Sequence, residues 1–202
     1  MAKKTESAAE SGSFFEGKIL YDNTYKSKNM MMPSALWNSM MGAKGEYYIQ
    51  DGNYKLISNG SLNKWQLYIN KDNKVYSKLS SSSAVLFNEG ETQGDEVLKV
   101  EVNKNVIEVL GYSCDEVILT CKSGVQKFYF NSDIAVDAKQ FEKHKFVNWY
   151  DYVKVAKALP LKRIVNTSYF TMECIATEVT PMKLDISLFE LPEGVEVKKN
   201  PY

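Results

Sequence analysis

The feature that most constrains this chain is a succession of short segments in which apolar and polar residues alternate, separated by turn-forming residues. The pattern begins with residues 16–26 (EGKILYDNTYK) and recurs in residues 45–60, where Asp51-Gly52 stands between two alternating runs. Asp-Gly accepts the positive φ angles of a two-residue hairpin turn. Residues 64–80 repeat the pattern around a turn at 71–73. A period of two residues is typical of half-buried strands, so this half of the chain predicts β-structure.

A second group of alternating segments occupies the other half of the chain. Residues 98–112 alternate around 103–105, and residues 113–131 continue through a turn at 122–124. Residues 161–181 supply two more strands, broken near Asn166-Thr167 and ended by Pro181. Short connections between consecutive strands favour antiparallel pairing in a meander. The aromatic content of 12% also suits pleated surfaces, so we predict a mainly β (α+β) fold with a long antiparallel sheet.

Two segments depart from the alternation and predict short helices that cover the sheet. In residues 33–42 (PSALWNSMMG) the apolar residues Leu36, Trp37, Met40 and Met41 form one helical stripe, and Gly42 follows as a C-terminal cap. The stripe therefore predicts one amphipathic helix early in the chain.

The second predicted helix lies within residues 141–160. Tyr152, Val155, Ala156 and Leu159 share one helical face there, and Pro160 ends the helix because proline cannot continue it. His144 stands among charged residues in the sequence EKHKF, and we expect it to be exposed to solvent.

The first 13 residues are expected to be a disordered leader or tether, followed by a single domain over residues 14–202. Residues 2–13 (AKKTESAAESGS) contain no large apolar side chain. Two interpretations stay open: a native cytosolic start with a frayed end, or a mature form in which Met1 replaces a removed signal peptide and a lipidated cysteine. The 25 basic and 25 acidic residues balance, so the overall charge does not favour nucleic acid as a partner.

Several stretches resemble, in order, the LolA-like superfamily of periplasmic lipoprotein carriers. They are FEGKILYD, VIEVLGYSCDEVILTCKSGVQKFYFNSDI, LPLKRIV and TMECIATEVTPMKLDISLFELPEG. Residues 185–192 are similar to a "D-x-S-x-F-x-x-P" ending, and residues 111–114 are similar to a "G-Y-x-C" that opens a strand. The resemblance is closest to small uncharacterised secreted or lipid-anchored relatives in Gram-negative bacteria.

This resemblance implies an incomplete, curved antiparallel barrel whose concave apolar face is covered by short helices. In the carrier that cavity holds the acyl chains of a lipoprotein. By resemblance, we expect a periplasmic or outer-membrane-anchored protein. Its expected partner is a lipid or other hydrophobic ligand, or else a lipoprotein or another envelope protein. A lipidated amino terminus would tether it to the membrane.

The methionine-rich stretch has two interpretations. Methionine is flexible and polarizable, so the helix could be a lid over an apolar ligand, or its residues could be ordinary core. Met30, Met31 and Met32 precede the helix and are expected to form a hinge or an exposed apolar edge. If the helix is a lid, the ligand-binding residues would be Leu36, Trp37, Met40, Met41, Tyr21, Phe128 and Phe130.

Catalytic and metal sites find little support in the sequence. His144 is the only histidine, so sites that need two histidines or a Cys-His pair are hard to assemble. Asp115 and Glu116 are neighbours on a predicted strand and point to opposite faces, so they cannot share a proton. We therefore predict no enzyme activity, no catalytic residues, no metal and no cofactor.

The three cysteines are expected to be buried thiols, with one disulfide as the alternative. Cys114 and Cys121 fall on one predicted strand, about 23 Å apart at roughly 3.3 Å per residue, and cannot pair with each other. Cys174 could pair with either of them in an oxidising compartment.

Two functional hypotheses follow. The leading one is a non-enzymatic cell-envelope binding protein that holds an apolar or lipid-like ligand in a half-barrel cavity. The alternative is a structural or protein-interaction module with a fully packed core and no small-molecule ligand.

Overall fold

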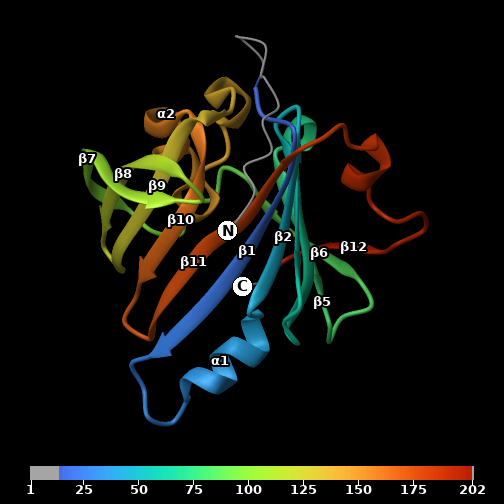
Figure 1. The fold of residues 1–202 in the computed structure, drawn as a ribbon. Coiled ribbons are helices and arrows are strands. Elements are labelled where there is room, and N and C mark those ends of the chain that lie inside the picture. The colour runs from blue at the N-terminus through green and yellow to red at the C-terminus, as the bar shows by residue number, and fades with distance from the viewer. Residues whose placement is uncertain (1–13, 202) are drawn as a thin grey trace.

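The computed structural model describes residues 14–201, which form one open, curved sheet of twelve strands with two α-helices (Figure 1). The predicted leader lies outside the described residues. The mainly β fold is confirmed, and the sheet does not close into a barrel. The strands are β1 (Gly17–Ser27), β2 (Lys44–Gln50), β3 (Asn53–Ser58), β4 (Asn63–Ile69), β5 (Lys74–Leu79), β6 (Val85–Glu89), β7 (Val97–Val109), β8 (Tyr112–Cys121), β9 (Gly124–Ala135), β10 (Ala158–Asn166), β11 (Phe170–Pro181) and β12 (Val197–Lys199).

The strand order is β12-β6-β5-β4-β3-β2-β1-β11-β10-β9-β8-β7. Two meanders, β2 to β6 and β7 to β11, therefore flank β1. That strand pairs antiparallel with β2 on one side and with the distant β11 on the other. The only parallel pair recorded in the described residues is β12 with β6. Long-range pairing of β1 with β11 joins the two meanders into one sheet.

The predicted turns are confirmed. Asp51 and Gly52 connect β2 to β3 with φ angles of 47° and 74°, the positive values that a two-residue hairpin needs. Asn73 has a φ of 49° at the turn between β4 and β5, beside the 3₁₀ helix η1 (Asn70–Asp72). The break at Asn166-Thr167 and the end of the last long strand at Pro181 also match the sequence.

The first predicted helix is confirmed as α1 (Ser34–Met41), with Gly42 as its C-cap at a φ of 94°. The prediction for residues 141–160 was wrong in extent. These residues are divided among the end of η2 (Ala138–Phe141), η3 (Phe146–Asn148), α2 (Trp149–Ala156) and the start of β10. Positive φ angles at Val147 and Asn148 interrupt the helix, and Lys157, with a φ of 50°, ends it.

Leu159 and Pro160 therefore belong to β10 and not to the helix. Pro160 is tolerated in the strand because the pairing of β10 with β9 shifts register around it. Within α2 the buried residues are Trp149, Tyr152, Val153 and Ala156, whereas Val155 is exposed. The prediction that Tyr152 and Ala156 share the buried face of a helix is confirmed. The same prediction for Val155 and Leu159 was wrong.

The two faces of the sheet are covered by different parts of the chain. Tyr68 and Val75 are cross-strand partners in the main core beneath α2, and we call this side the α2 face. Their sequence neighbours Leu67 and Tyr76 point the other way, toward a second cluster that includes Phe189. Phe189 belongs to η4 (Ile186–Phe189), so the C-terminal segment covers the other face of β3 to β6.

Candidate functional site

The seven residues predicted to bind a ligand fall into two groups. Tyr21, Phe128 and Phe130 are each at most 8% exposed and belong to the main core. The Tyr152 ring of α2 stacks on Phe128 with centroids 4.2 Å apart and meets Phe130 edge-on. The hydroxyl of Tyr21 donates a hydrogen bond to the carbonyl of Pro160 at 2.7 Å. The Tyr152 side chain of α2 thus lies against Phe128 and Phe130, and the backbone of β10 binds the hydroxyl of Tyr21.

The other four residues lie on α1, at the opposite end of the sheet from α2 (Figure 1). None of the residues of α1 is buried. Trp37 packs on Phe170 with ring centroids 4.6 Å apart, Met40 and Met41 are half-buried, and Leu36 is exposed. The structure therefore does not bring the two groups together, and ligand binding by the seven residues stays a prediction.

Helix α1 contacts β1 through polar side chains. Asn38 Oδ1 accepts a hydrogen bond from the backbone N–H of Tyr25, and Asn38 Nδ2 donates to the carbonyls of Ser34 and Tyr25. The hydroxyl of Ser34 accepts from the N–H of Ser27. The pairing of β2 with β1 extends only to Asp22, so Asn38 and Ser34 satisfy backbone groups of β1 that no strand reaches on that side.

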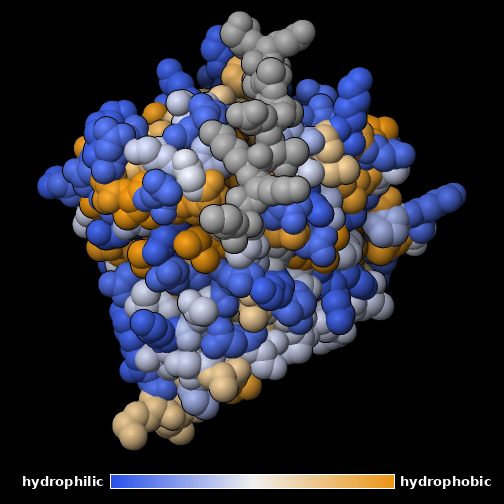
Figure 2. All heavy atoms as spheres, in the orientation of Figure 1, coloured by the Kyte–Doolittle hydropathy of each residue, from blue (hydrophilic) through white to orange (hydrophobic). Residues whose placement is uncertain are grey.

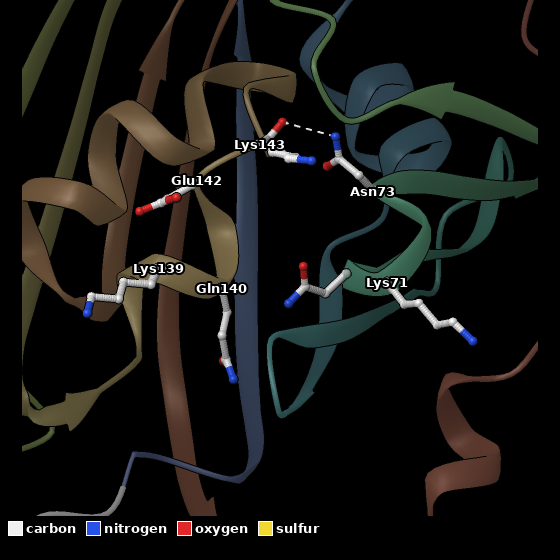
Figure 3. A pocket seen from close by; sticks show the side chains of 7 residues that line it. Lys71, Asn73, Lys139, Gln140, Glu142 and Lys143 are labelled. Atoms are coloured by element: carbon white, nitrogen blue, oxygen red, sulfur yellow. Dashed lines mark hydrogen bonds between the residues drawn. The ribbon is translucent and has the colours of Figure 1, made fainter.

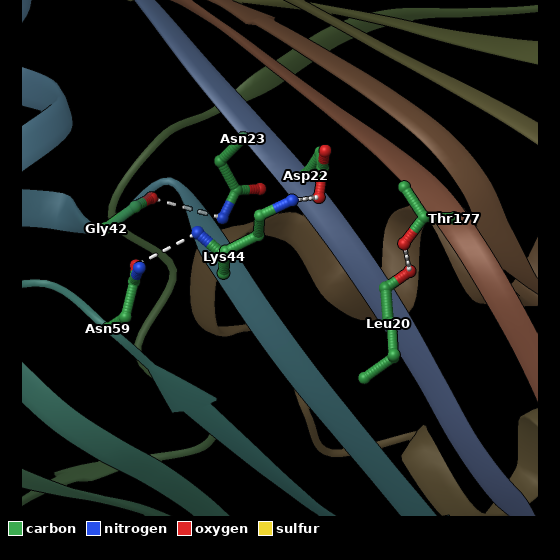
Figure 4. Close-up of polar contacts among 7 residues, drawn as sticks. All are labelled: Leu20, Asp22, Asn23, Gly42, Lys44, Asn59 and Thr177. Carbon is green, nitrogen blue, oxygen red and sulfur yellow. Dashed lines mark hydrogen bonds and ion pairs between the residues drawn. The ribbon is translucent and has the colours of Figure 1, made fainter.

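Polar contacts also fix the C-terminal end of α1 (Figure 4). Asn23 Nδ2 donates to the carbonyl of Gly42 at 3.3 Å, and Asn59 Oδ1 accepts from the N–H of Lys44 at 3.0 Å. The ammonium of Lys44 pairs with Asp22 across β1 and β2 at 2.6 Å. The helix is therefore held at both ends, and its outward side chains keep a defined position.

The most exposed apolar residues lie on the turn between β1 and α1. Met30 and Met31 are 100% and 92% exposed, and Leu36 and Tyr169 are 43% and 65% exposed. Tyr169 is adjacent because its carbonyl accepts a hydrogen bond from the N–H of Lys28. We call Met30, Met31, Leu36 and Tyr169 the methionine pole. Figure 2 shows an apolar tip at this end of the molecule, over the turn after β1.

Side chains within the turn shape the methionine pole. Asn29 Oδ1 accepts a hydrogen bond from the N–H of Met31 at 2.9 Å, and the carbonyl of Asn29 accepts from the N–H of Met32. The hydroxyl of Ser27 bonds to both backbone groups of Asn29. Such local bonds to asparagine and serine side chains define a turn conformation. The two methionines are therefore presented outward by a structured turn.

In the sequence, lysines and no carboxylates lie close to the methionine residues of the pole. No Asp or Glu occurs between Asn23 and Gly45, a segment that contains Lys26 and Lys28 as well as Lys44, whose charge pairs with Asp22. Lys28 Nζ bonds to Asn166 Oδ1 and to the carbonyl of Thr167, which ties the turn to the β10–β11 loop. Lys26 is exposed. This end of the molecule therefore combines exposed apolar groups with positive charge.

The expectation that His144 is exposed was wrong, because it is 0% exposed. Its Nε2 and the hydroxyl of Tyr54 share a hydrogen bond of 2.9 Å, and its ring stacks on Tyr68 and faces Trp149. Burial lowers the pKa of His144 to about 3. Its charged sequence neighbours Lys143 and Lys145 point to solvent, and they misled the prediction. A histidine with this pKa stays neutral and cannot exchange protons near pH 7.

The other titratable groups that the sequence singled out are held apart or protonated. Asp115 is bound by Lys104, whereas Glu116 accepts hydrogen bonds from Asn103 and Lys127. All three cysteines are free thiols. Cys114 and Cys121 are buried on β8 as predicted, whereas Cys174 is half-buried and forms no disulfide. Burial raises the pKa values of Cys121 and Cys174 to about 11, so both stay protonated and poorly nucleophilic at pH 7.

The described residues form at least two shallow clefts. One, of about 220 Å³, lies between the η1 turn on one side and η2 with the residues that follow it on the other (Figure 3). Its walls are polar, and Asn73 Nδ2 donates across it to the carbonyl of Lys143 at 3.3 Å. The lining residues are Asn70, Lys71, Asn73, Lys139, Gln140, Glu142 and Lys143. The other, of about 240 Å³, lies over β9 to β11 and is lined by Val125, Lys127, Tyr129, Ile164, Asn166 and Thr171.

Sequence reasoning identified part of the methionine pole. It named residues 30–32 as a hinge or an exposed apolar edge, and the structure favours the exposed edge for Met30 and Met31. Tyr169 was missed because it lies on the loop between β10 and β11, which is far from residues 30–36 in the sequence. Asn38 was placed correctly off the apolar stripe, but its bonds to β1 could not be read from the sequence. That contact fixes how α1 lies on β1, with Trp37 packed on Phe170 and Leu36 exposed.

Comparisons with known proteins show a related fold and nothing further. No protein-family model matches the sequence, and no curated protein matches it either. The fold is similar to that of PNGF-II in its C2 crystal form, with a TM-score of 0.50 and 14% identity over 91% of this chain. The chain spans 30% of the length of PNGF-II. An uncharacterized conserved protein from Thermus thermophilus also matches, with a TM-score of 0.48 and 8% identity over 92% of this chain and 91% of that one.

Proposed function

We propose that this chain is a non-enzymatic docking module that binds an anionic lipid surface through the methionine pole. The observation that carries the proposal is the exposure of Met30 and Met31, at 100% and 92%, on a structured turn. Flexible, polarizable methionine side chains adapt to irregular apolar surroundings. An apolar tip that projects from the fold suits insertion among lipid acyl chains.

The composition around the tip favours a lipid surface as the partner. Tyr169 has an apolar ring and a polar hydroxyl, the combination that is enriched at membrane–water interfaces. Lys26 and Lys28 flank the tip, and each basic residue near an anionic leaflet contributes about 1 kcal/mol to binding. Interfacial binding scales with the buried apolar area plus this electrostatic attraction. Of the helices in the described part of the chain, none combines the length and apolarity that a membrane span needs.

This proposal retains the lipid of the leading sequence hypothesis but places it outside the fold. The aromatic contacts of Tyr152 with Phe128 and Phe130 support it, because they fill the space where an enclosed acyl chain would lie. The neutral buried histidine and the protonated thiols support a non-enzymatic role. The resemblance to LolA-like carriers and a location in the cell envelope agree with a lipid partner and remain predictions.

Co-sedimentation with vesicles tests the proposal. We expect the full chain to bind vesicles of phosphatidylcholine mixed with phosphatidylglycerol and to bind pure phosphatidylcholine more weakly. The double variant Met30→Ser/Met31→Ser should bind roughly 100-fold more weakly, because burial of each methionine contributes about 1.5 kcal/mol or more. Ile186→Ser is the matched control, since Ile186 is also exposed, at 59%, but lies on η4. Equal binding by the double variant and the control would refute the proposal.

A further inference from the structure

Strand β7 forms one edge of the sheet and has an unpaired side. It is the last strand in the sheet order, and β8 is its only partner among the described strands. Every second residue of such an edge strand directs its backbone N–H and C=O away from the sheet. At 13 residues β7 is long for an edge strand. Natural edge strands that stay unpaired are short or protected by charge, bulges or proline.

The side chains of β7 are unusually apolar for an exposed edge. Leu98, Val100, Val102 and Val106 are 59%, 39%, 45% and 41% exposed. Val100 and Val102 are the cross-strand partners of the buried Leu119 and Val117, so they continue the core-facing side of the sheet to its edge. Apolar side chains gather over the β7 to β9 part of the surface (Figure 2).

The charges of β7 are self-complementary about Val100. Lys99 and Glu101 flank it, pair with each other at 2.9 Å and are 64% and 44% exposed. In an antiparallel pair with a second β7 centred on Val100, Lys99 lies opposite Glu101 of the other copy, twice by symmetry. Val100 then lies opposite Val100 of the other copy, on the apolar side of both strands. The two ion pairs within the separate strands, one in each copy, can therefore be exchanged for two ion pairs between copies.

Other registers of the same pairing are unfavourable. Centring the pair on Lys99 or on Glu101 sets like charges directly opposite each other, which destabilises a strand pair. A slip of one residue sets Val100 opposite Glu101 and turns the apolar side of one copy toward solvent. The pairing of β7 with β8 shifts register between Val97 and Lys99 and again between Asn103 and Ile107, so the edge is regular only from Lys99 to Asn103. Within this regular part, the register centred on Val100 alone sets opposite charges and the apolar Val100 residues against each other.

We propose that β7 pairs with β7 of a second copy of this chain, antiparallel and centred on Val100, which joins the two sheets. The match of charged and apolar side chains around Val100 points to a second copy as the occupant. The proposal rests on β7 and does not depend on the methionine pole, which lies on α1 and the turns beside it.

Charge reversal tests the register. We expect sedimentation equilibrium of the full chain to show a monomer–dimer equilibrium. Lys99→Glu should weaken dimerisation about tenfold, because it places like charges opposite each other twice. The double variant Lys99→Glu/Glu101→Lys should restore it, since the pairs re-form with reversed sign. A chain that is monomeric at every concentration, or a single reversal without effect, would overturn the proposal.

Cysteine cross-linking tests the register through the distance between two residues, which salt does not screen as it screens charge effects. With Val100 on the two-fold axis, Val100→Cys should form an intermolecular disulfide on mild oxidation, because directly opposite Cβ atoms lie about 5 Å apart. Leu98→Cys is the control, because it lies two residues from the axis and does not face Leu98 of the other copy. Wild-type chain shows the background from Cys114, Cys121 and Cys174. Equal cross-linking of both variants would contradict this register.

Discussion

The ring of His144 stacks on the ring of Tyr68, with centroids 4.0 Å apart and an interplanar angle of 16°. Tyr68 comes from β4 and His144 from the segment between η2 and η3, so this contact joins the sheet to the chain that covers its α2 face. The hydrogen bond between His144 and Tyr54 of β3 adds a second link. The buried histidine is therefore a structural part of the core.

We predict that His144 makes stability depend on pH. Burial lowers its pKa from 6.5 to about 3, so the unfolded chain binds a proton that the folded chain excludes between these values. The stability that neutral His144 contributes is thus complete above about pH 6.5 and is lost as the pH falls toward 3. His144→Phe should flatten this part of the dependence of the melting temperature on pH.

The same variant should cost about 1–3 kcal/mol at pH 7, because the buried hydroxyl of Tyr54 loses its partner. The double variant Tyr54→Phe/His144→Phe removes both partners and should recover part of that loss. Parallel pH profiles for wild type and His144→Phe would show that His144 does not set the pH dependence.

Tyr152 fills the core above Phe128, and we predict that truncating its side chain strongly destabilises the fold. Tyr152→Ala should destabilise the fold by about 3–5 kcal/mol in urea unfolding, because a large aromatic side chain leaves a cavity. Tyr152→Phe loses only the hydrogen bond to the carbonyl of Ala158 and should cost about 1 kcal/mol. Tyr150→Ala, on the same helix but half-buried, is the matched control. A small effect of Tyr152→Ala would mean that the core is loosely packed.

Gly124 opens β9 in a conformation that excludes a side chain. Its φ is 153°, and an added Cβ would lie 1.9 Å from the carbonyl oxygen of Asn166 on β10. Gly124→Ala should therefore lower the melting temperature by several degrees, because the strand pair must separate locally. Gly94→Ala meets no atom within 4 Å and should be neutral or slightly stabilising. Indistinguishable melting temperatures for the two variants would contradict this placement of β9 against β10.

Glu116 is a buried carboxylate whose ion pair should matter for stability. Its side chain is 6% exposed. Burial acts to raise its pKa, but hydrogen bonds from Asn103, Tyr129 and Lys127 outweigh this and lower it. Lys127→Ala should cost about 1–3 kcal/mol at neutral pH, since the carboxylate loses a charged partner. The cost should shrink as the pH falls below 4.5 and Glu116 becomes protonated in the unfolded chain.

Lys122→Ala is the control for that prediction. Lys122 pairs with Glu96, and both side chains are largely exposed, so its removal should change stability by less than about 1 kcal/mol. Similar losses for Lys122→Ala and Lys127→Ala would show that the burial of Glu116 has no energetic consequence.

The strands and turns could be predicted because their signals are local. Alternation and the Asp51-Gly52 hairpin depend on neighbouring residues, and both are confirmed. The helix over residues 141–160 was overpredicted because tertiary contacts impose positive φ angles at Val147 and Asn148 that no local pattern announces. His144 was misplaced because its neighbours in sequence are charged, whereas its neighbours in space are aromatic.

The candidate site was only partly predictable for the same reason. The methionines stand out in the sequence, but the direction of α1 depends on the hydrogen bonds between Asn38 and Tyr25 of β1. The contribution of Tyr169 depends on a loop that the fold brings beside Lys28. A stripe of apolar residues predicts a helix. The tertiary contacts of that helix then decide whether the stripe faces a core, a ligand or solvent.

Docking through the methionine pole requires Met31 to enter a lipid bilayer, which fluorescence can detect. An environment-sensitive fluorophore attached through Met31→Cys should shift its emission to the blue when vesicles containing phosphatidylglycerol are added, because the probe leaves water for acyl chains. The same fluorophore at Ile186→Cys should remain unchanged. A probe at position 31 that stays in water while the protein is mixed with these vesicles would contradict the proposed docking through the methionine pole.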